Sequence, residues 1–294
     1  MKIIDGKKIA QDIRAEIASV VKKMIADGQR VPHLAAVLVG DDPASQTYVK
    51  SKEKDCFEVG FISSVYRYPA SITEKALLDA VEFLNKDEEI DGFIVQLPLP
   101  VHISAEKVIR SINPEKDVDG FHPMNIGNMA LNLPCYLPAT PYGIVQLIKR
   151  SDIETEGKHC VVLGRSNIVG TPVSILMSRN NKNANCTVTL CHSKTKNLKE
   201  ICLSADILIA AIGRKEFVTA DMVKEGTVVI DVGIHRIPAP ETQSGFRLKG
   251  DVDFDEVAKK CSYITPVPGG VGPMTRVSLL LNTLKAAGKE MDIS

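Results

Sequence analysis

The sequence has no excess of charge of either sign, and this limits the partners that it can be expected to bind. Its 294 residues include 36 Lys and Arg and 36 Asp and Glu, so the net charge is zero. Because binding to nucleic acid needs a basic surplus or at least a basic stripe, we expect no nucleic acid among its main partners. A local basic pocket for a small anion is still compatible with this composition.

Long apolar runs, paired cysteines and metal-ligand spacings are also missing. No stretch approaches the ~18 apolar residues of a membrane span, and the N-terminal segment becomes charged without the apolar core of a signal peptide. The seven cysteines are scattered without a CxxC pair, and the six histidines show no spacing typical of metal ligands. We therefore expect a soluble, cytoplasmic protein with reduced thiols, no contact with membranes and no metal.

Helix and strand patterns alternate along most of the chain, with one interruption. Apolar residues recur at helical spacing over residues 9–24, and HLAAVLVG (33–40) is typical of a buried strand. Five prolines between Pro114 and Pro141 mark a boundary, after which four strands are expected, at 159–164, 186–191, 206–213 and 227–234. The sequence therefore predicts an α/β protein with two α/β domains, the C-terminal one a Rossmann-type, doubly wound parallel sheet.

The segment VVLGRSNIVGTP (161–172) follows an expected strand and opens an expected helix. At this turn a doubly wound sheet holds a pyrophosphate on the backbone amides of the helix N-terminus. The GxGxxG fingerprint is absent, because the glycines are Gly164 and Gly170, and a glycine that ends a strand is often only a turn former. The order of strand, glycine, polar residues and helix nevertheless favours a dinucleotide site.

The end of the next strand distinguishes between the two dinucleotides. An NAD site usually has Asp or Glu there to bind the ribose hydroxyls, whereas this strand ends in CHSKTK (191–196), without an acid. Hydroxyl and cationic side chains suit a 2′-phosphate, and Arg165 can bind the same anion with two hydrogen bonds. The alternative for the lysines is a solvated polar turn. We expect NADP to be favoured over NAD.

A lysine occupies the apolar face of the helix that is expected between Ser45 and Gly60. Lys52 lies on the same stripe as the residues expected to be buried, which are Val49, Cys56 and Val59. Tyr48 is four residues before Lys52, so the two side chains are neighbours on one helix face. Lys52 either extends to solvent or sits in a pocket, where its pKa would fall and its neutral amine could accept a proton.

Three further polar side chains fall where a pocket would form. Gln96 interrupts FIVQLPLP at the end of an expected strand, and Asp117 and Asp119 lie in the loop NPEKDVDGF (113–121). A loop aspartate is more often a turn former than a ligand. Together with Lys52 and Tyr48, these groups could still hold a flat heterocycle, stacked on the tyrosine and bonded at its edge by a carboxylate.

Seven collinear segments carry a resemblance that covers the chain from about Asp5 to Ala287. They are SQTYVKSK, VQLPLP, PEKDVDG, GRSNIVGTP, HSKT, DVGI and PGGVGPMT. In this order they resemble the bifunctional (FolD-type) methylenetetrahydrofolate dehydrogenase/methenyltetrahydrofolate cyclohydrolase family. The resemblance implies NADP-dependent oxidation of 5,10-methylenetetrahydrofolate to the 5,10-methenyl form, followed by hydrolysis to 10-formyltetrahydrofolate.

The same resemblance implies a domain layout and a homodimer. A folate-binding catalytic domain would cover residues 1–140, with a C-terminal helix at 273–294 packed back onto it. An NADP-binding Rossmann domain would cover residues 141–272, and the active site would be the cleft between the two. The chain departs from the family at Ala139, where the family usually has cysteine, and in the lengthened loop RNNKNANC (179–186).

The resemblance also implies roles for individual residues. Lys52 is the implied catalytic lysine, with Tyr48 stacked on the folate, Gln96 orienting the lysine and Asp119 binding the edge of the pterin. The other implied substrate-binding residues are Val95, Leu97, Pro268, Gly269, Gly270, Val271 and Gly272. The implied cofactor-binding residues are Gly164, Arg165, Ser166, Ser193 and Ile234.

Three alternatives stay open at this point. The first is a single-activity dehydrogenase that uses NAD, with Lys52 only structural. The second is a non-catalytic dinucleotide sensor, which the joint presence of Lys52, Gln96 and Asp119 disfavours. The third is an unrelated hydroxy-acid dehydrogenase, in which His192 or His235 would have to accept the proton.

Overall fold

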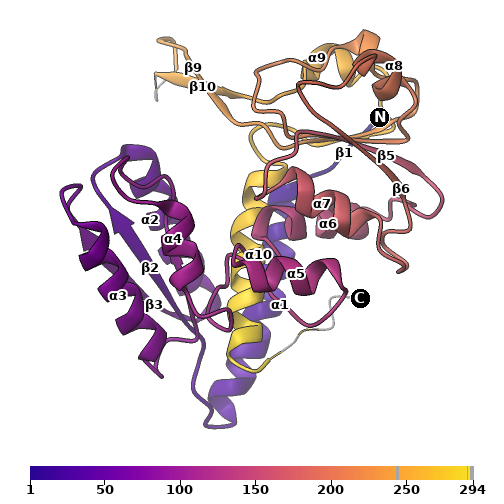
Figure 1. Ribbon diagram of the computed structural model, residues 1–294. Helices are drawn as coiled ribbons and strands as arrows, with labels where there is room; N and C mark the ends of the chain where they lie inside the picture. Colours follow the sequence, from indigo (N-terminus) through magenta and orange to yellow (C-terminus); the bar gives the residue numbers. More distant parts are fainter. Residues whose placement is uncertain (243–244, 290, 292–294) are drawn as a thin grey trace. The chain divides into compact units, whose positions relative to one another are not determined.

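The computed structural model describes residues 1–242, 245–289 and 291, and it divides into two compact units (Figure 1). The six-stranded unit contains residues 1–10 and 140–275, and the three-stranded unit contains residues 11–139 and the C-terminal helix from Arg276. The predicted α/β class with two domains is confirmed. The assignment of residues 1–140 and 273–294 to a folate-binding domain, and of residues 141–272 to an NADP-binding domain, stays a prediction.

A parallel sheet with the strand order β3-β2-β4 forms the centre of the three-stranded unit. Its strands are β2 (His33–Val39), β3 (Ile62–Tyr68) and β4 (Gly92–Val95). The helices in or entering this unit are α1 (Gly6–Ala26), α2 (Pro43–Val59), α3 (Glu74–Lys86), α4 (Ala105–Ser111), α5 (Pro123–Ala130) and α10 (Val271–Ala286). Phe93 of β4 is buried against Leu77 and Val81 of α3 and Val108 of α4, so one apolar layer fixes both helices to the sheet.

Six parallel strands form the sheet of the other unit, in the order β1-β11-β8-β7-β5-β6. They are β1 (Lys2–Ile3), β5 (His159–Leu163), β6 (Thr187–Cys191), β7 (Ile207–Ala210), β8 (Val228–Asp231) and β11 (Tyr263–Ile264). The chain runs from β5 outward to β6 and then crosses to β7 on the other side. The point where the topology reverses, which is the ligand position in such sheets, therefore lies between β5 and β7.

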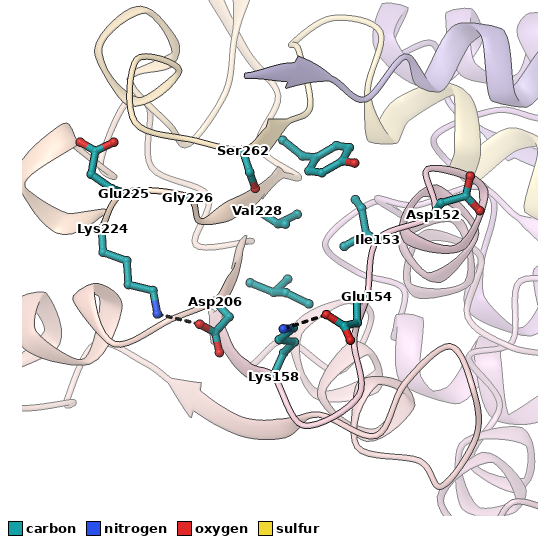
Figure 2. A pocket seen from close by; sticks show the side chains of 12 residues that line it. Asp152, Ile153, Glu154, Lys158, Asp206, Lys224, Glu225, Gly226, Val228 and Ser262 are labelled. Atoms are coloured by element: carbon teal, nitrogen blue, oxygen red, sulfur yellow. Dashed lines mark hydrogen bonds and ion pairs between the residues drawn. The ribbon is translucent and has the colours of Figure 1, made fainter.

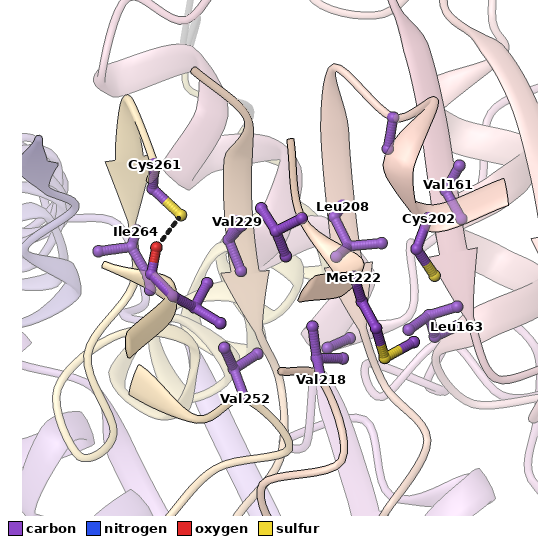
Figure 3. Close-up of a cluster of buried hydrophobic side chains, with 14 of the residues drawn as sticks. Val161, Leu163, Cys202, Leu208, Val218, Met222, Val229, Val252, Cys261 and Ile264 are labelled. Carbon is purple, nitrogen blue, oxygen red and sulfur yellow. Dashed lines mark hydrogen bonds between the residues drawn. The ribbon is translucent and has the colours of Figure 1, made fainter. Parts of the chain in front are cut away.

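One face of this sheet is covered by short helices and buried apolar side chains (Figure 3). The helices of the unit are α6 (Ala139–Arg150), α7 (Gly170–Met177), α8 (Leu198–Leu203), the 3₁₀ helix η1 (Ala220–Met222) and α9 (Phe254–Val257). Cys202 of α8 and Met222 of η1 pack in one cluster with Val161 of β5, Leu208 of β7 and Val229 of β8. An antiparallel hairpin of β9 (His235–Pro238) and β10 (Phe246–Lys249) extends the chain after β8.

Helix α2 ends before Gly60, as predicted, and begins two residues ahead of the expected Ser45. Asp42 caps its N-terminus by accepting a hydrogen bond from the N–H of Ser45 at 2.7 Å, and Pro43 suits the first helical turn. Gly60 ends the helix in the left-handed region, at φ 82°, where only glycine is free of strain. The predicted apolar stripe of this helix is buried. Among the described residues, no helix is long and apolar enough to cross a membrane.

Candidate functional site

Lys52 projects from the buried side of α2 and is only partly exposed. Its Nζ donates a hydrogen bond to Oε1 of Gln96, which follows β4, at 3.1 Å. Two residues 44 positions apart are thus brought together by helix α2 and the end of strand β4. Tyr48, one turn earlier on α2, keeps 45% of its surface exposed, so its ring is open to a ligand.

The charge on Lys52 is destabilised by its surroundings. Burial lowers the pKa of the Lys52 ammonium below that of an ordinary lysine, while the negative charge of Asp119 acts against this shift. Burial also raises the pKa of Asp119, and the charge of Lys52 opposes that rise. Each group therefore holds the other nearer its ionised form. An amine with a lowered pKa can exchange a proton closer to neutral pH, which acid–base catalysis requires.

Gln96 is fixed in one orientation by its own contacts. Its backbone N–H donates to the carbonyl of Val37 on β2 at 2.9 Å, which extends the sheet pairing by one residue. Its side-chain Nε2 donates to the carbonyl of Leu97 at 2.7 Å. Since the amide nitrogen is used in this way, Oε1 is the atom that faces Lys52. Val95 is buried, and Leu97 is half-buried beside the glutamine.

The two aspartates of the loop after α4 have different surroundings. Asp117 is buried and accepts hydrogen bonds from the backbone N–H of His122 at 2.7 Å and from Nδ2 of Asn125 at 2.9 Å. Burial raises the pKa of Asp117 to about 6. This carboxyl shapes the loop, whereas Asp119 is electrostatically coupled to Lys52. Of the two, Asp119 is the one placed to act with the lysine.

The loop between β5 and α7 shows why its two glycines stand six residues apart. Gly164 has φ 110°, and a Cβ there would overlap the carbonyl oxygen of Ala211 after β7. A Cβ on Gly170 would overlap the carbonyl of Gly164, so strand end and helix start are in direct backbone contact. Ser166 Oγ accepts hydrogen bonds from the N–H groups of Val169, at 3.2 Å, and Gly170, at 3.4 Å, at the N-terminus of α7.

The loop after β6 presents the hydroxyl and cationic groups that the sequence predicted. Its backbone is held by Thr195, whose Oγ1 accepts from the N–H of His192 at 2.8 Å, and by His192 Nδ1, which accepts from the N–H of Lys194 at 3.2 Å. Ser193 and Arg165 are exposed. Both belong to loops at the carboxyl ends of the adjacent strands β5 and β6, which is where this fold places the pyrophosphate and the ribose.

The glycine-rich segment Pro268–Gly272 lies in the six-stranded unit and leads into α10. Gly269, at φ 113°, accepts a hydrogen bond from the N–H of Lys7 at 3.0 Å. A Cβ on Gly6 would overlap the carbonyl oxygen of Gly270, so the segment packs tightly on the start of α1. The remaining predicted cofactor residue, Ile234, follows β8 and is 46% exposed.

The sequence reasoning missed two buried carboxylates in the six-stranded unit, Asp231 and Asp251, which are 3% and 0% exposed. Asp231 ends β8 within the motif DVGI, and Asp251 follows β10. For Asp231 the available signal was an acid at the end of the apolar strand VVID, whereas Asp251 follows the polar strand FRLK and Gly250 and carries no such signal.

A separate pocket of about 530 Å³ lies at the opposite, amino-terminal edge of the six-stranded sheet (Figure 2). Lys158 and Lys224 line it, and each is paired with a carboxylate, of Glu154 at 2.9 Å and of Asp206 at 2.7 Å. Ligands of doubly wound sheets bind at the carboxyl ends of the strands. This pocket is therefore not the expected dinucleotide site.

Two family models match consecutive parts of the chain. Residues 4–119 match the catalytic domain of tetrahydrofolate dehydrogenase/cyclohydrolase, and residues 138–291 match the NAD(P)-binding domain of the same enzymes. The first match contains Lys52, Gln96 and Asp119, and the second contains the loops after β5, β6 and β8. The predicted dinucleotide-binding region is thus confirmed at the level of the domain.

Whole-chain comparisons agree with the family models. The chain is 62% identical to the bifunctional protein FolD of Cytophaga hutchinsonii over 287 residues, which are 98% of this chain and 99% of that protein. It superimposes with a TM-score of 0.92 and 47% identity on the FolD methylenetetrahydrofolate dehydrogenase/cyclohydrolase of Campylobacter jejuni, covering 98% and 99% of the two chains. The Trypanosoma brucei FolD, crystallised with NADP and an inhibitor, gives a TM-score of 0.91 at 38% identity, with 97% of each chain covered.

These matches confirm the resemblance and the function that it implied, and they exclude the sensor and the hydroxy-acid dehydrogenase. The activities are the oxidation of methylenetetrahydrofolate and the hydrolysis of methenyltetrahydrofolate in one-carbon metabolism. The chain belongs to the tetrahydrofolate dehydrogenase/cyclohydrolase family.

Proposed function

We propose that Lys52 carries out the proton transfers in the hydrolysis of 5,10-methenyltetrahydrofolate. Water adds to the methenyl carbon, and the adduct loses and regains protons as it opens to 10-formyltetrahydrofolate. The hydrogen bond from Lys52 Nζ to Gln96 at 3.1 Å is the observation that carries this assignment. Burial lowers the pKa of the lysine and makes its neutral amine available to accept a proton from the attacking water.

Gln96 and Asp119 have supporting roles in this proposal. Gln96 orients the lysine, because its own amide nitrogen is held by the Leu97 carbonyl. Asp119 keeps the lysine from losing its charge entirely, and it binds the polar edge of the pterin. The exposed ring of Tyr48 stacks on the substrate. Val95, Leu97 and the segment Pro268–Gly272 complete the substrate-binding residues.

The dehydrogenase reaction makes a different demand on the protein. NADP, the cofactor, accepts a hydride from the methylene carbon between N5 and N10 of the folate. The nitrogen lone pairs stabilise the resulting cation, so this step needs no general base. The residues of this chain therefore contribute mainly by positioning the reactants.

The loops of the six-stranded unit suit NADP. The amides at the start of α7, after Gly164, favour the pyrophosphate because the helix N-terminus carries partial positive charge. Arg165, Ser166 and Ser193 bind the 2′-phosphate and the neighbouring ribose in this proposal, and the loop after β6 has no acid to repel the phosphate. Ile234 lines the site from the loop after β8.

We also propose a cytoplasmic homodimer. The dimer rests on the family resemblance. The cytoplasmic location rests on the seven free cysteines, of which all but Cys135 are buried, as expected of a protein in a reducing compartment. Light scattering on the purified protein tests the dimer, and a mass of one chain would exclude it.

A single assay tests the function as a whole. The purified protein is mixed with 5,10-methylenetetrahydrofolate and either NADP or NAD, and both cofactor reduction and the folate product are followed. We expect NADP reduction with 10-formyltetrahydrofolate formed faster than by spontaneous hydrolysis. Accumulation of the methenyl compound would leave Lys52 without its catalytic role. Equal use of NAD would contradict the 2′-phosphate assignment.

A further inference from the structure

Asp251 joins two loops at the carboxyl end of the six-stranded sheet. Its side chain is completely buried. Oδ2 accepts hydrogen bonds from the backbone N–H groups of Ile212, at 2.7 Å, and Gly213, at 2.8 Å, in the loop after β7. Oδ1 faces Nε2 of His235 at 2.8 Å, at the start of β9. One carboxylate thus fixes the segments that follow two neighbouring strands.

Asp231 completes this arrangement from the end of β8. Its Oδ1 accepts from the N–H groups of Gly233, at 2.9 Å, and Asp251, at 2.8 Å, and its Oδ2 accepts from that of Val252 at 3.0 Å. A Cβ on Gly233 would overlap the carboxylate of Asp251, and one on Gly250 would overlap that of Asp231. Each carboxylate therefore occupies the space that a glycine in the opposite segment leaves free.

Ile234 lies between two anchored residues. Gly233 before it is bound to Asp231, and His235 after it is bound to Asp251. The isoleucine itself is 46% exposed. An exposed apolar side chain on a backbone held from both sides is suited to contact a ligand with little loss of conformational freedom.

The strand order indicates which half of the dinucleotide meets this loop. The pyrophosphate belongs to the loop between β5 and α7, and the adenosine half extends over β6, where Ser193 lies. The other half must extend to the opposite side of β5, over β7 and β8. The loops that Asp251 fixes are the ones that follow β7 and β8.

We propose that Asp251, acting with His235, is a positioning residue for the nicotinamide half of NADP. The inference rests on the cofactor site proposed above and deepens it. Asp251 does not touch the cofactor. It sets the path of the loops 211–213 and 232–235, and through them the place of Ile234. Its loss therefore misplaces the nicotinamide and leaves the binding of the adenosine half intact.

Three variants and a matched control test this role. Asp251→Ala leaves the N–H groups of Ile212 and Gly213 without their acceptor, and His235→Ala removes only the anchor next to Ile234. Asp251→Asn keeps an oxygen for both N–H groups, and its amide nitrogen can donate to Nε2 of His235 in the tautomer with the proton on Nδ1. Arg236→Ala, an exposed neighbour that stacks on Phe246, is the control.

Two readouts separate positioning from a general structural effect. The first is kcat/KM for NADP in the dehydrogenase reaction, and the second is the inhibition constant of 2′,5′-ADP, which lacks the nicotinamide. We expect His235→Ala to lower kcat/KM about tenfold, as for a lost charge-assisted hydrogen bond, with an unchanged constant for 2′,5′-ADP. Asp251→Ala should lower kcat/KM further. Asp251→Asn and Arg236→Ala should have kcat/KM values near that of the unsubstituted protein.

The outcomes distinguish this inference from the proposed function. One outcome would make Asp251 a structural residue only. In it, the unsubstituted protein binds 2′,5′-ADP and reduces NADP, and His235→Ala and Asp251→Asn have the same kcat/KM for NADP as this protein. Only Asp251→Ala differs, because it fails to fold. An equal loss of 2′,5′-ADP and NADP affinity in His235→Ala would likewise overturn the positioning role. Failure of the unsubstituted protein to bind 2′,5′-ADP would instead contradict the cofactor site itself, and the inference with it.

Discussion

Each unit holds charged side chains away from water, but with different partners. In the three-stranded unit the charge is that of Lys52, and in the six-stranded unit it is that of Asp231 and Asp251. The Lys52 ammonium has three N–H donors, and in the described structure the hydrogen bond to Gln96 is the one it makes. The carboxylate of Asp231 accepts three backbone hydrogen bonds, and that of Asp251 accepts two and contacts His235.

This difference separates a reactive group from a structural one. A buried charge surrounded by backbone N–H groups is held in place and has little capacity left for a ligand. A buried ammonium with unused N–H donors is unfavourable in the free protein, and those donors can form hydrogen bonds with a substrate. The remaining hydrogen-bonding capacity of a buried charge is thus a better guide to catalysis than burial alone.

The largest effect should follow from removing the reactive charge. Lys52→Met should lower cyclohydrolase activity by ~10²–10⁴-fold, the usual contribution of acid–base catalysis, while hydride transfer partly survives. The two activities are measured separately, with methenyltetrahydrofolate and with methylenetetrahydrofolate. Lys50→Met, at an exposed position of the same helix, is the control. Equal loss of both activities would assign Lys52 to binding.

Filling the space beside the structural carboxylates should affect stability. Gly250→Ala forces a methyl group against Asp231 and should lower the free energy of unfolding by about 1–3 kcal/mol. Gly127→Ala in α5, where a Cβ meets nothing within 4 Å, should instead raise it by up to about 1 kcal/mol, because alanine is the better helix former. Urea unfolding of both variants measures the contrast, and similar midpoints would show that the carboxylate region can relax.

An exposed cation of the six-stranded unit should affect binding alone. Arg165→Ala removes a charge-assisted contact to the 2′-phosphate and should raise KM for NADP about tenfold or more, with little change for NAD. Ser193→Ala should act in the same direction and less strongly. Steady-state kinetics with both cofactors measure the ratio. A parallel rise for NADP and NAD would place Arg165 away from the phosphate.

The shift of the pH profile between variants should be the smallest of these effects, and it reports on the charge of Lys52. Because the neutral amine is the active form, the cyclohydrolase rate should rise about tenfold per pH unit until the pH passes the lowered pKa of Lys52. Asp119 raises that pKa, so Asp119→Asn should move the profile to lower pH. A shift to higher pH, or none, would show that Asp119 does not act on the charge of Lys52.

Much of this site could be predicted because its signals are local. Lys52 stood out as a charge on an apolar helix stripe, and the end of α2 was predicted from Gly60. Gln96 stood out because a polar residue ended an apolar strand. In the six-stranded unit, the four strands expected from 159 to 234 are the structure's β5 to β8.

Several of the elements that were missed, among them the shortest strands of the six-stranded unit, depend on contacts between distant segments. Strands β1 and β11 have two residues each and exist through pairing with each other and with β8. The hairpin of β9 and β10 was also missed. The carboxylates of Asp231 and Asp251 look like ordinary turn acids in the sequence, since the N–H groups that they bind belong to other segments, including Ile212 and Gly213 after β7.

The interlocking of Asp231 with Gly250, and of Asp251 with Gly233, has an evolutionary consequence. Substituting either glycine alone is unfavourable, because its Cβ overlaps the facing carboxylate. Once the facing aspartate has been replaced by a smaller residue, the same Cβ has room. The two sites of each pair should therefore show strong epistasis, with a double-substitution cost well below the sum of the single costs. A relative in which either glycine is replaced should therefore also have a smaller residue in place of the facing aspartate.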